Sequence, residues 1–176
     1  MSHINIKITG GKIGMDLRYA KPVPTLVGIT LINQTETAII YGGLESLNAV
    51  GLDITTQISG PVIKVQPPNW AVSLYNYGPV SIVDSKIIFT GNQPNTIAIG
   101  TANRSMYLNN IYIQGADKVL VNPDGSNFLA NKDGWIKINE YAYKVIPPME
   151  TYNGENFQYQ HSVYVNGAET GNIIDY

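Results

Sequence analysis

Residues 16–21 gather four side chains that could act together on a bound ligand: Asp16, Arg18, Tyr19 and Lys21. Asp16 and Arg18 are two residues apart, so on a β-strand they share one face. In one interpretation Arg18 binds a carboxylate of the ligand, and Tyr19 or Lys21 is the base that removes a neighbouring proton. In the other interpretation Asp16 and Arg18 form only a surface ion pair, which contributes little to stability.

A second set of candidates follows from a repeat of about 23 residues in the first part of the chain. Counted along this repeat, the outward column that contains Arg18 also contains Tyr41, Gln66, Gly100 and Asn122. Aromatic faces stack on sugar rings and amides bind hydroxyl groups, so Arg18, Tyr41 and Gln66 are candidate substrate-binding residues. The alternative is an ordinary polar surface without a ligand.

An inserted segment supplies further aromatic candidates. Trp70 ends the run Gln66-Pro67-Pro68-Asn69-Trp70, and Tyr75 and Tyr77 follow closely. A loop of this kind could form a platform for a sugar ring. Alternatively, Trp70 anchors the loop against the body of the domain.

Three other side chains are predicted to have no role in binding or catalysis. Trp135 alternates with Ile136-Lys137-Ile138 and is predicted to pack against other side chains rather than to bind a sugar. Lys86 and Arg104 are predicted to be single exposed cations without a partner pattern.

The elements that must position these residues are indicated by a recurring apolar triplet. It occurs as Ile6-Lys7-Ile8, Ile29-Thr30-Leu31, Leu52-Asp53-Ile54, Ile87-Ile88-Phe89 and Ile111-Tyr112-Ile113. The first residues of the triplets are 23, 23, 35 and 24 positions apart, and other apolar stretches flank each triplet. Such spacing predicts an all-β fold, a parallel β-helix of about five three-stranded coils over residues 1–122. Alternation within each triplet predicts that its outer two residues face the core.

The main alternative is an antiparallel sandwich, whose hairpins favour Asn-Gly and Asp-Gly turns. Residues 1–122 contain neither dipeptide. All four copies come later, as Asp124-Gly125, Asp133-Gly134, Asn153-Gly154 and Asn166-Gly167. We therefore expect residues 123–176 to form an aromatic-rich, partly antiparallel region that caps or flanks the coils.

The coil sequences resemble the pectate-lyase-like right-handed parallel β-helix superfamily. Three phrases within residues 4–122 carry the resemblance: Val27-Gly28-Ile29-Thr30-Leu31-Ile32-Asn33, Ala49-Val50-Gly51-Leu52-Asp53-Ile54 and Leu108-Asn109-Asn110-Ile111-Tyr112-Ile113. The resemblance implies a bacterial or phage protein that acts on polysaccharide, secreted, periplasmic or at the cell surface. Because the chain begins in a predicted strand behind Met-Ser-His, it is expected to be a piece of a larger protein whose signal lies elsewhere.

The resemblance also bears on catalysis. Its inverting hydrolases use clustered aspartates, but the four aspartates of the coils, Asp16, Asp53, Asp84 and Asp117, include no adjacent pair. Its lyases often bind calcium on an acidic cluster, and no acidic cluster is evident in the coils. If the protein is catalytic, a polysaccharide lyase that uses Arg18 with Tyr19 or Lys21 is therefore favoured over a glycoside hydrolase.

The amino-acid composition limits the kinds of partner that we expect the protein to bind. Only 14% of the residues are charged and the net charge is −2, which argues against nucleic acid and an anionic membrane surface. The chain has no Cys, which excludes disulfides and thiolate metal sites. Two functions remain open: a polysaccharide-engaging protein, or a non-catalytic structural or display segment of an adhesin or tailspike. Either function allows a homo-oligomer or the rest of a larger parent chain as a partner.

Overall fold

The computed structural model describes residues 1–20, 22–67, 78–101, 104–122, 125–129, 134–143, 164–165 and 168–169. Every regular element in these ranges is a β-strand, and the strands form two sheets. None of the described residues belongs to a helix long and apolar enough to cross a membrane.

The larger sheet, called sheet A here, has 11 strands. Its parallel part consists of β1 (Ser2–Ile4), β2 (Lys7–Thr9), β4 (Thr25–Val27), β5 (Thr30–Ile32), β7 (Leu47–Val50), β8 (Asp53–Thr56), β10 (Val80–Phe89) and β12 (Met106–Gln114). Sheet B has six strands, of which five are parallel: β3 (Ile13–Leu17), β6 (Thr37–Tyr41), β9 (Ile63–Val65), β11 (Ile97–Gly100) and β13 (Lys118–Val121).

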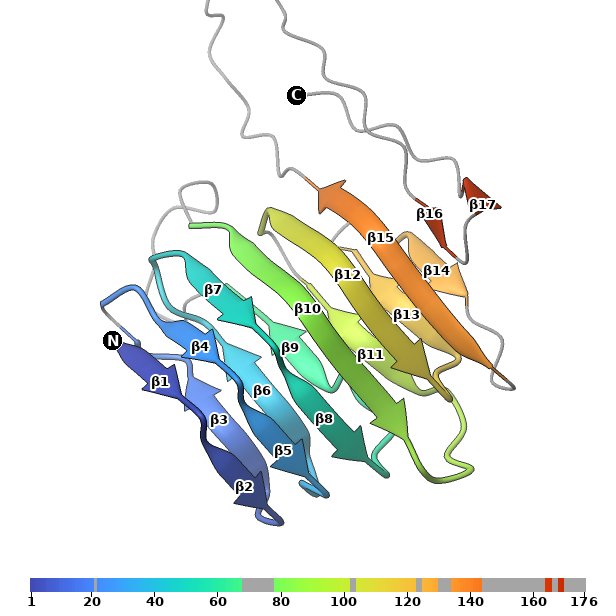
Figure 1. Ribbon diagram of the computed structural model, residues 1–176, viewed down its shortest axis with the longest axis horizontal. Helices are drawn as coiled ribbons and strands as arrows, with labels where there is room; N and C mark the ends of the chain where they lie inside the picture. Colours follow the sequence, from blue (N-terminus) through green and yellow to red (C-terminus); the bar gives the residue numbers. More distant parts are fainter. Residues whose placement is uncertain are drawn as a thin grey trace, which may run out of the picture.

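The two sheets are the walls of a parallel β-solenoid. The chain descends in sheet A, rises in sheet B behind it and advances from left to right, so it winds right-handed (Figure 1). The predicted all-β parallel β-helix is confirmed. The predicted count of about five coils is slightly too high, because the chain completes about four turns between its five strand layers.

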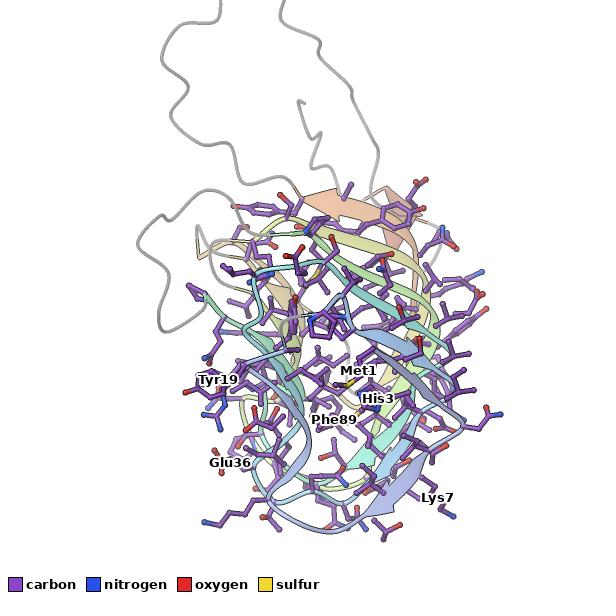
Figure 2. The ribbon with its side chains drawn as sticks, turned by 90° about the vertical axis from the view of Figure 1, so that its left-hand side faces the viewer. Met1, His3, Lys7, Tyr19, Glu36 and Phe89 are labelled. Atoms are coloured by element: carbon purple, nitrogen blue, oxygen red, sulfur yellow. The ribbon has the colours of Figure 1, made fainter. Side chains whose placement is uncertain are left out.

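The core lies between the two sheets and is built from stacked columns of side chains. One column crosses the whole of sheet A: Ile8, Leu31, Ile54, Ile87, Ile113 and Ile136. Viewed along the solenoid, the strands enclose the apolar side chains, with Phe89 inside the ring and Lys7, Tyr19 and Glu36 outside it (Figure 2). The predicted inward positions of the triplets are therefore correct in orientation.

The predicted alignment of the fourth coil is wrong by two residues. Ile87 pairs with Ile54, and Phe89 pairs with Thr56, whereas the triplet pattern matched Phe89 to Ile54. Ser85 takes the place opposite Leu52, and its hydroxyl accepts a hydrogen bond from the Leu52 amide at 3.0 Å. A slip of two residues keeps every side chain on its own face, so the apolar pattern could not detect it.

A bend divides sheet A lengthwise, at the same point in each of the five layers. The residues at this point all have positive φ angles of 49–69°: Asn5, Gly28, Gly51, Asp84 and Asn110. Asn, Asp and Gly are the residues that adopt this left-handed conformation most readily. A Cβ atom at Gly28 would also lie 2.6 Å from Oδ1 of Asn5, so that exposed side chain would have to shift.

The parallel order ends at the C-terminal side of the solenoid. β15 (Trp135–Tyr143) pairs antiparallel with β12, and β14 (Asn127–Leu129) pairs antiparallel with β13. Two short strands, β16 (Tyr164–Val165) and β17 (Ala168–Glu169), extend sheet A beyond β15. These pairings confirm a partly antiparallel C-terminal region; a domain boundary at residue 122 stays a prediction.

Candidate functional site

Asp16 and Arg18 form the ion pair that their spacing allows. Nε of Arg18 donates to Oδ1 and Oδ2 of Asp16 at 2.9 and 3.1 Å, and a terminal guanidinium nitrogen donates to Oδ2 at 2.5 Å. This hydrogen bonding holds the pKa of the Asp16 carboxyl below its ordinary value. Because both side chains are about one-third exposed, a ligand carboxylate would have to compete with Asp16 for Arg18.

Of the other two members of the predicted catalytic set, the structure describes only Tyr19. Tyr19 follows Arg18 and is 62% exposed on the outside of the solenoid (Figure 2). Lys21 lies outside the described residues, as do Trp70, Tyr75 and Tyr77 of the inserted segment. Their roles in catalysis or sugar binding stay predictions.

The predicted outward column through Arg18 is wrong at Tyr41. Tyr41 pairs with Leu17 rather than with Arg18, faces the core and is completely buried. Gly42 takes the outward place, where a Cβ atom would lie 3.4 Å from both Arg18 and Gln66. The outer surface therefore carries Arg18, Gly42 and Gln66 in adjacent layers.

The same displacement moves Asn122 from the predicted surface into the core. Asn122 is 4% exposed, and its side-chain oxygen accepts a hydrogen bond from the Tyr141 hydroxyl at 2.8 Å. Gly100, the remaining member of the predicted column, pairs with Lys64 instead.

Arg104 is buried, which corrects its prediction as an exposed cation. Its guanidinium donates to the carbonyl oxygens of Gly43, Glu45 and Gly78, at 2.5, 3.3 and 2.8 Å. It also lies 4.7 Å above the centre of the Tyr41 ring, whose hydroxyl donates to the Glu45 carbonyl. Arg104 thus ties together backbone segments that are distant in sequence, because Gly43 and Gly78 both bind it.

Burial of Tyr41 predicts a loss of stability in alkali. Desolvation raises the pKa of the Tyr41 phenol above its ordinary value of 10.0. The group therefore contributes stability that is complete below about pH 10 and is lost as the pH rises further. We expect the thermal midpoint, followed by circular dichroism, to fall less steeply above pH 10 in Tyr41→Phe than in the wild type. Parallel curves for the two proteins would contradict this prediction.

The outer face of sheet A carries an open cleft of about 400 Å³ lined by Lys86, Tyr112 and Trp135. These residues belong to neighbouring strands, since β12 pairs with β10 on one side and with β15 on the other. Tyr112 is 38% exposed and Trp135 is 47% exposed, so about half of the Trp135 side chain packs against the protein and the rest faces solvent. Gln114 pairs directly with Trp135, which brings an amide group to the same surface.

Two interactions fix the position of the cleft's side chains. Nζ of Lys86 lies 3.0 Å from Oδ2 of Asp53, so the prediction that Lys86 has no partner is wrong. Nζ of Lys137 lies 5.4 Å from the centre of the Tyr112 ring, within the range of a cation–π interaction. The cleft therefore combines two aromatic rings with the ammonium group of Lys86. The carboxylate of Asp53 neutralises this ammonium group, but the ion pair is exposed and therefore weak.

The cleft's volume and composition are typical of a small-ligand site. Such sites occupy about 300–1,000 Å³ and combine apolar or aromatic walls with a few polar groups. In the part of the chain that the structure describes, no group of three or more His, Asp or Glu side chains could hold a metal ion. The side chains that line the cleft can stack on rings, donate hydrogen bonds and pair with an anion.

The fold and the cleft define the protein as a parallel β-solenoid with an aromatic surface site. Comparison adds no narrower class: no family model matches the chain, and no curated protein or solved structure is significantly similar to it.

Proposed function

We propose that the protein is a carbohydrate-binding β-solenoid and that a polysaccharide docks in the cleft of Lys86, Tyr112 and Trp135. The observation that carries this proposal is the pair of exposed aromatic rings beside a lysine in one cleft on the outer face of sheet A. Exposed aromatic faces without an apolar partner suit the C–H faces of pyranose rings. The amide of Gln114 can bind hydroxyl groups of the sugar, and a sugar carboxylate can compete with Asp53 for the ammonium group of Lys86.

The resemblance of the coils to the pectate-lyase-like superfamily supports the same class of ligand. We favour this superfamily as the more specific classification of the solenoid. Membership of it implies that the protein acts outside the cell. If the protein is a lyase, we expect Asp16, Arg18 and Tyr19 to carry that activity.

Trp135→Ala is expected to weaken polysaccharide binding about tenfold, because an aromatic contact contributes on the order of 1.4 kcal/mol. Isothermal titration calorimetry with oligosaccharides of pectin, alginate and chondroitin sulfate measures the effect. Trp135→Phe should keep part of the affinity, since a smaller ring remains in place.

Tyr107→Ala provides the matched control, because Tyr107 is an exposed aromatic residue that does not line the cleft. It should bind as the wild type does. Wild-type protein that binds none of the oligosaccharides would refute the proposed function. Equal losses in Tyr107→Ala and Trp135→Ala would refute the cleft as its location. The release of unsaturated uronate from the same samples would add catalysis and direct attention to Arg18.

The second candidate is a structural segment, and a different feature of sheet A favours it. Ile4, Val27, Val50 and Val83 pair with one another across four layers and point outward. We call these four residues the aliphatic stripe. An apolar row of this kind is typical of a surface that packs against protein.

A further inference from the structure

The lysine that lines the cleft is paired with an acidic residue of the neighbouring strand. Lys86 and Asp53 stand directly opposite each other on β10 and β8, and Nζ of Lys86 lies 3.0 Å from Oδ2 of Asp53. Across the sheet, the next residue beyond Asp53 is Thr30 and the next beyond Lys86 is Tyr112, and both are uncharged. In the described part of the chain neither Lys86 nor Asp53 forms another ion pair.

This ion pair can open at little cost. Its two side chains are 43% and 44% exposed. One contact between an ammonium group and a carboxylate joins them, whereas Arg18 donates three side-chain hydrogen bonds to Asp16. A lysine ammonium group is a hydrated point charge on a flexible stem, so it can turn from one anion to another. An exposed pair of this kind contributes little to stability.

Asp53 is the one acidic residue in a row that is otherwise basic or neutral. The row crosses all six layers of sheet A in register: Lys7, Thr30, Asp53, Lys86, Tyr112 and Lys137. The next outward row is uncharged: Thr9, Ile32, Thr55, Ile88, Gln114 and Trp135. In the parallel layers both rows follow the residues of the bend, so they share one side of it with the cleft. On these two rows an anionic ligand in the cleft therefore meets a single repulsive group, the carboxylate of Asp53.

We propose that Asp53 determines how the cleft discriminates between acidic and neutral sugars, because it holds the ammonium group of Lys86. A neutral sugar contacts the aromatic rings and leaves the ion pair closed. A carboxylate or sulfate group in the same place has to displace Asp53 from Lys86 and then lies beside a like charge, which lowers its affinity. Asp53 is thus a specificity-determining residue that acts through Lys86, and this role rests on the proposed function.

Asp53→Asn tests the proposal by isothermal titration calorimetry. The probes are the acidic oligosaccharides of pectin, alginate and chondroitin sulfate, each beside a neutral form with methyl-esterified carboxylates and no sulfate. Asp53→Asn should bind the acidic form about threefold to fivefold more tightly than the wild type does, which is the upper range for an exposed ion pair. Its affinity for the neutral form should equal that of the wild type. A merely structural role of Asp53 would change both affinities together.

Two further variants show whether the effect depends on Lys86. Lys86→Met in the Asp53→Asn background should abolish the gain for the acidic form. Glu36→Gln is the matched control, because it removes the same charge from an exposed residue that precedes β6 of sheet B and lies outside the solenoid (Figure 2). It should bind both forms as the wild type does. Circular dichroism establishes that each variant is folded.

The role of Asp53 is overturned if Asp53→Asn binds the acidic form no more tightly than the wild type, or if it gains equally for both forms. A gain that persists in the Lys86→Met background, or that Glu36→Gln reproduces, also overturns it. In these cases the oligosaccharides still bind, so the proposed function stands. If neither the wild type nor Asp53→Asn binds any acidic or neutral form, the proposed function fails and the role of Asp53 fails with it.

Discussion

Arg104→Met is expected to lower the free energy of unfolding by about 3–5 kcal/mol. Methionine keeps an unbranched apolar stem but has no donors, so the carbonyl oxygens of Gly43, Glu45 and Gly78 would each lose a hydrogen bond from a charged group. A buried acceptor without a partner costs about 1–3 kcal/mol. Urea denaturation, followed by far-ultraviolet circular dichroism, measures the change.

The chain contains its own control for this experiment, because Arg18 is its other arginine. Arg18→Met removes an exposed ion pair and should leave the urea midpoint close to that of the wild type. Arg104→Lys should be intermediate, since an ammonium group reaches fewer carbonyls than a guanidinium fork. Equal urea midpoints for Arg104→Met and Arg18→Met would show that the hydrogen bonds of Arg104 do not stabilise the fold.

Ile54→Ala is expected to lower the free energy of unfolding by about 4 kcal/mol. Ile54 is completely buried and stands in the third layer, between Leu31 and Ile87 of the same column. Stability in a solenoid depends on contacts between adjacent layers, so a cavity in a middle layer weakens the packing on both sides. The same urea titration measures the effect.

Two positions provide controls with the same chemical change. Ile8→Ala should cost less, because Ile8 is in the first layer and is only partly buried. Ile88→Ala should cost least, since Ile88 points outward from β10. Equal costs at Ile8 and Ile54 would show that layers do not support one another in this protein.

The period of the first three layers could be predicted from the sequence because local and global signals agree there. Ile8, Leu31 and Ile54 recur at a constant interval along the chain and face the core in register. The absence of Asn-Gly and Asp-Gly turns before residue 122 was equally informative, since parallel strands have no hairpins. These signals determine the architecture but not the chemistry.

Corner length is the reason why the outward column could not be predicted. Leu17 and Tyr41 pair with each other, yet the path from Leu31 to Tyr41 is one residue longer than the path from Ile8 to Leu17. The corner absorbs the additional residue, so both strands keep the same face toward the core, but a count of 23 residues from the outward Arg18 reaches the inward Tyr41, because side chains alternate with a period of two. The repeat therefore predicts sheet A well and sheet B poorly.

The cleft was missed for a different reason. Trp135 and Tyr112 are distant in sequence and become neighbours only because β15 pairs antiparallel with β12. A repeat found in parallel coils cannot predict a contact made by a reversed strand. A local signal was nevertheless present, since the inward positions of Ile136 and Ile138 require Trp135 to face outward.

The residues with left-handed backbone that bend sheet A limit where the chain can accept insertions and deletions. Because the bend recurs at one place in every layer, a residue inserted within a strand would move the bend and disrupt all later layers. A corner between sheets carries no such constraint, as the long connection between the paired residues Ile54 and Ile87 illustrates. We therefore expect descendants of this chain to diverge by lengthening corners and by gaining or losing whole layers, while the strands themselves keep their length.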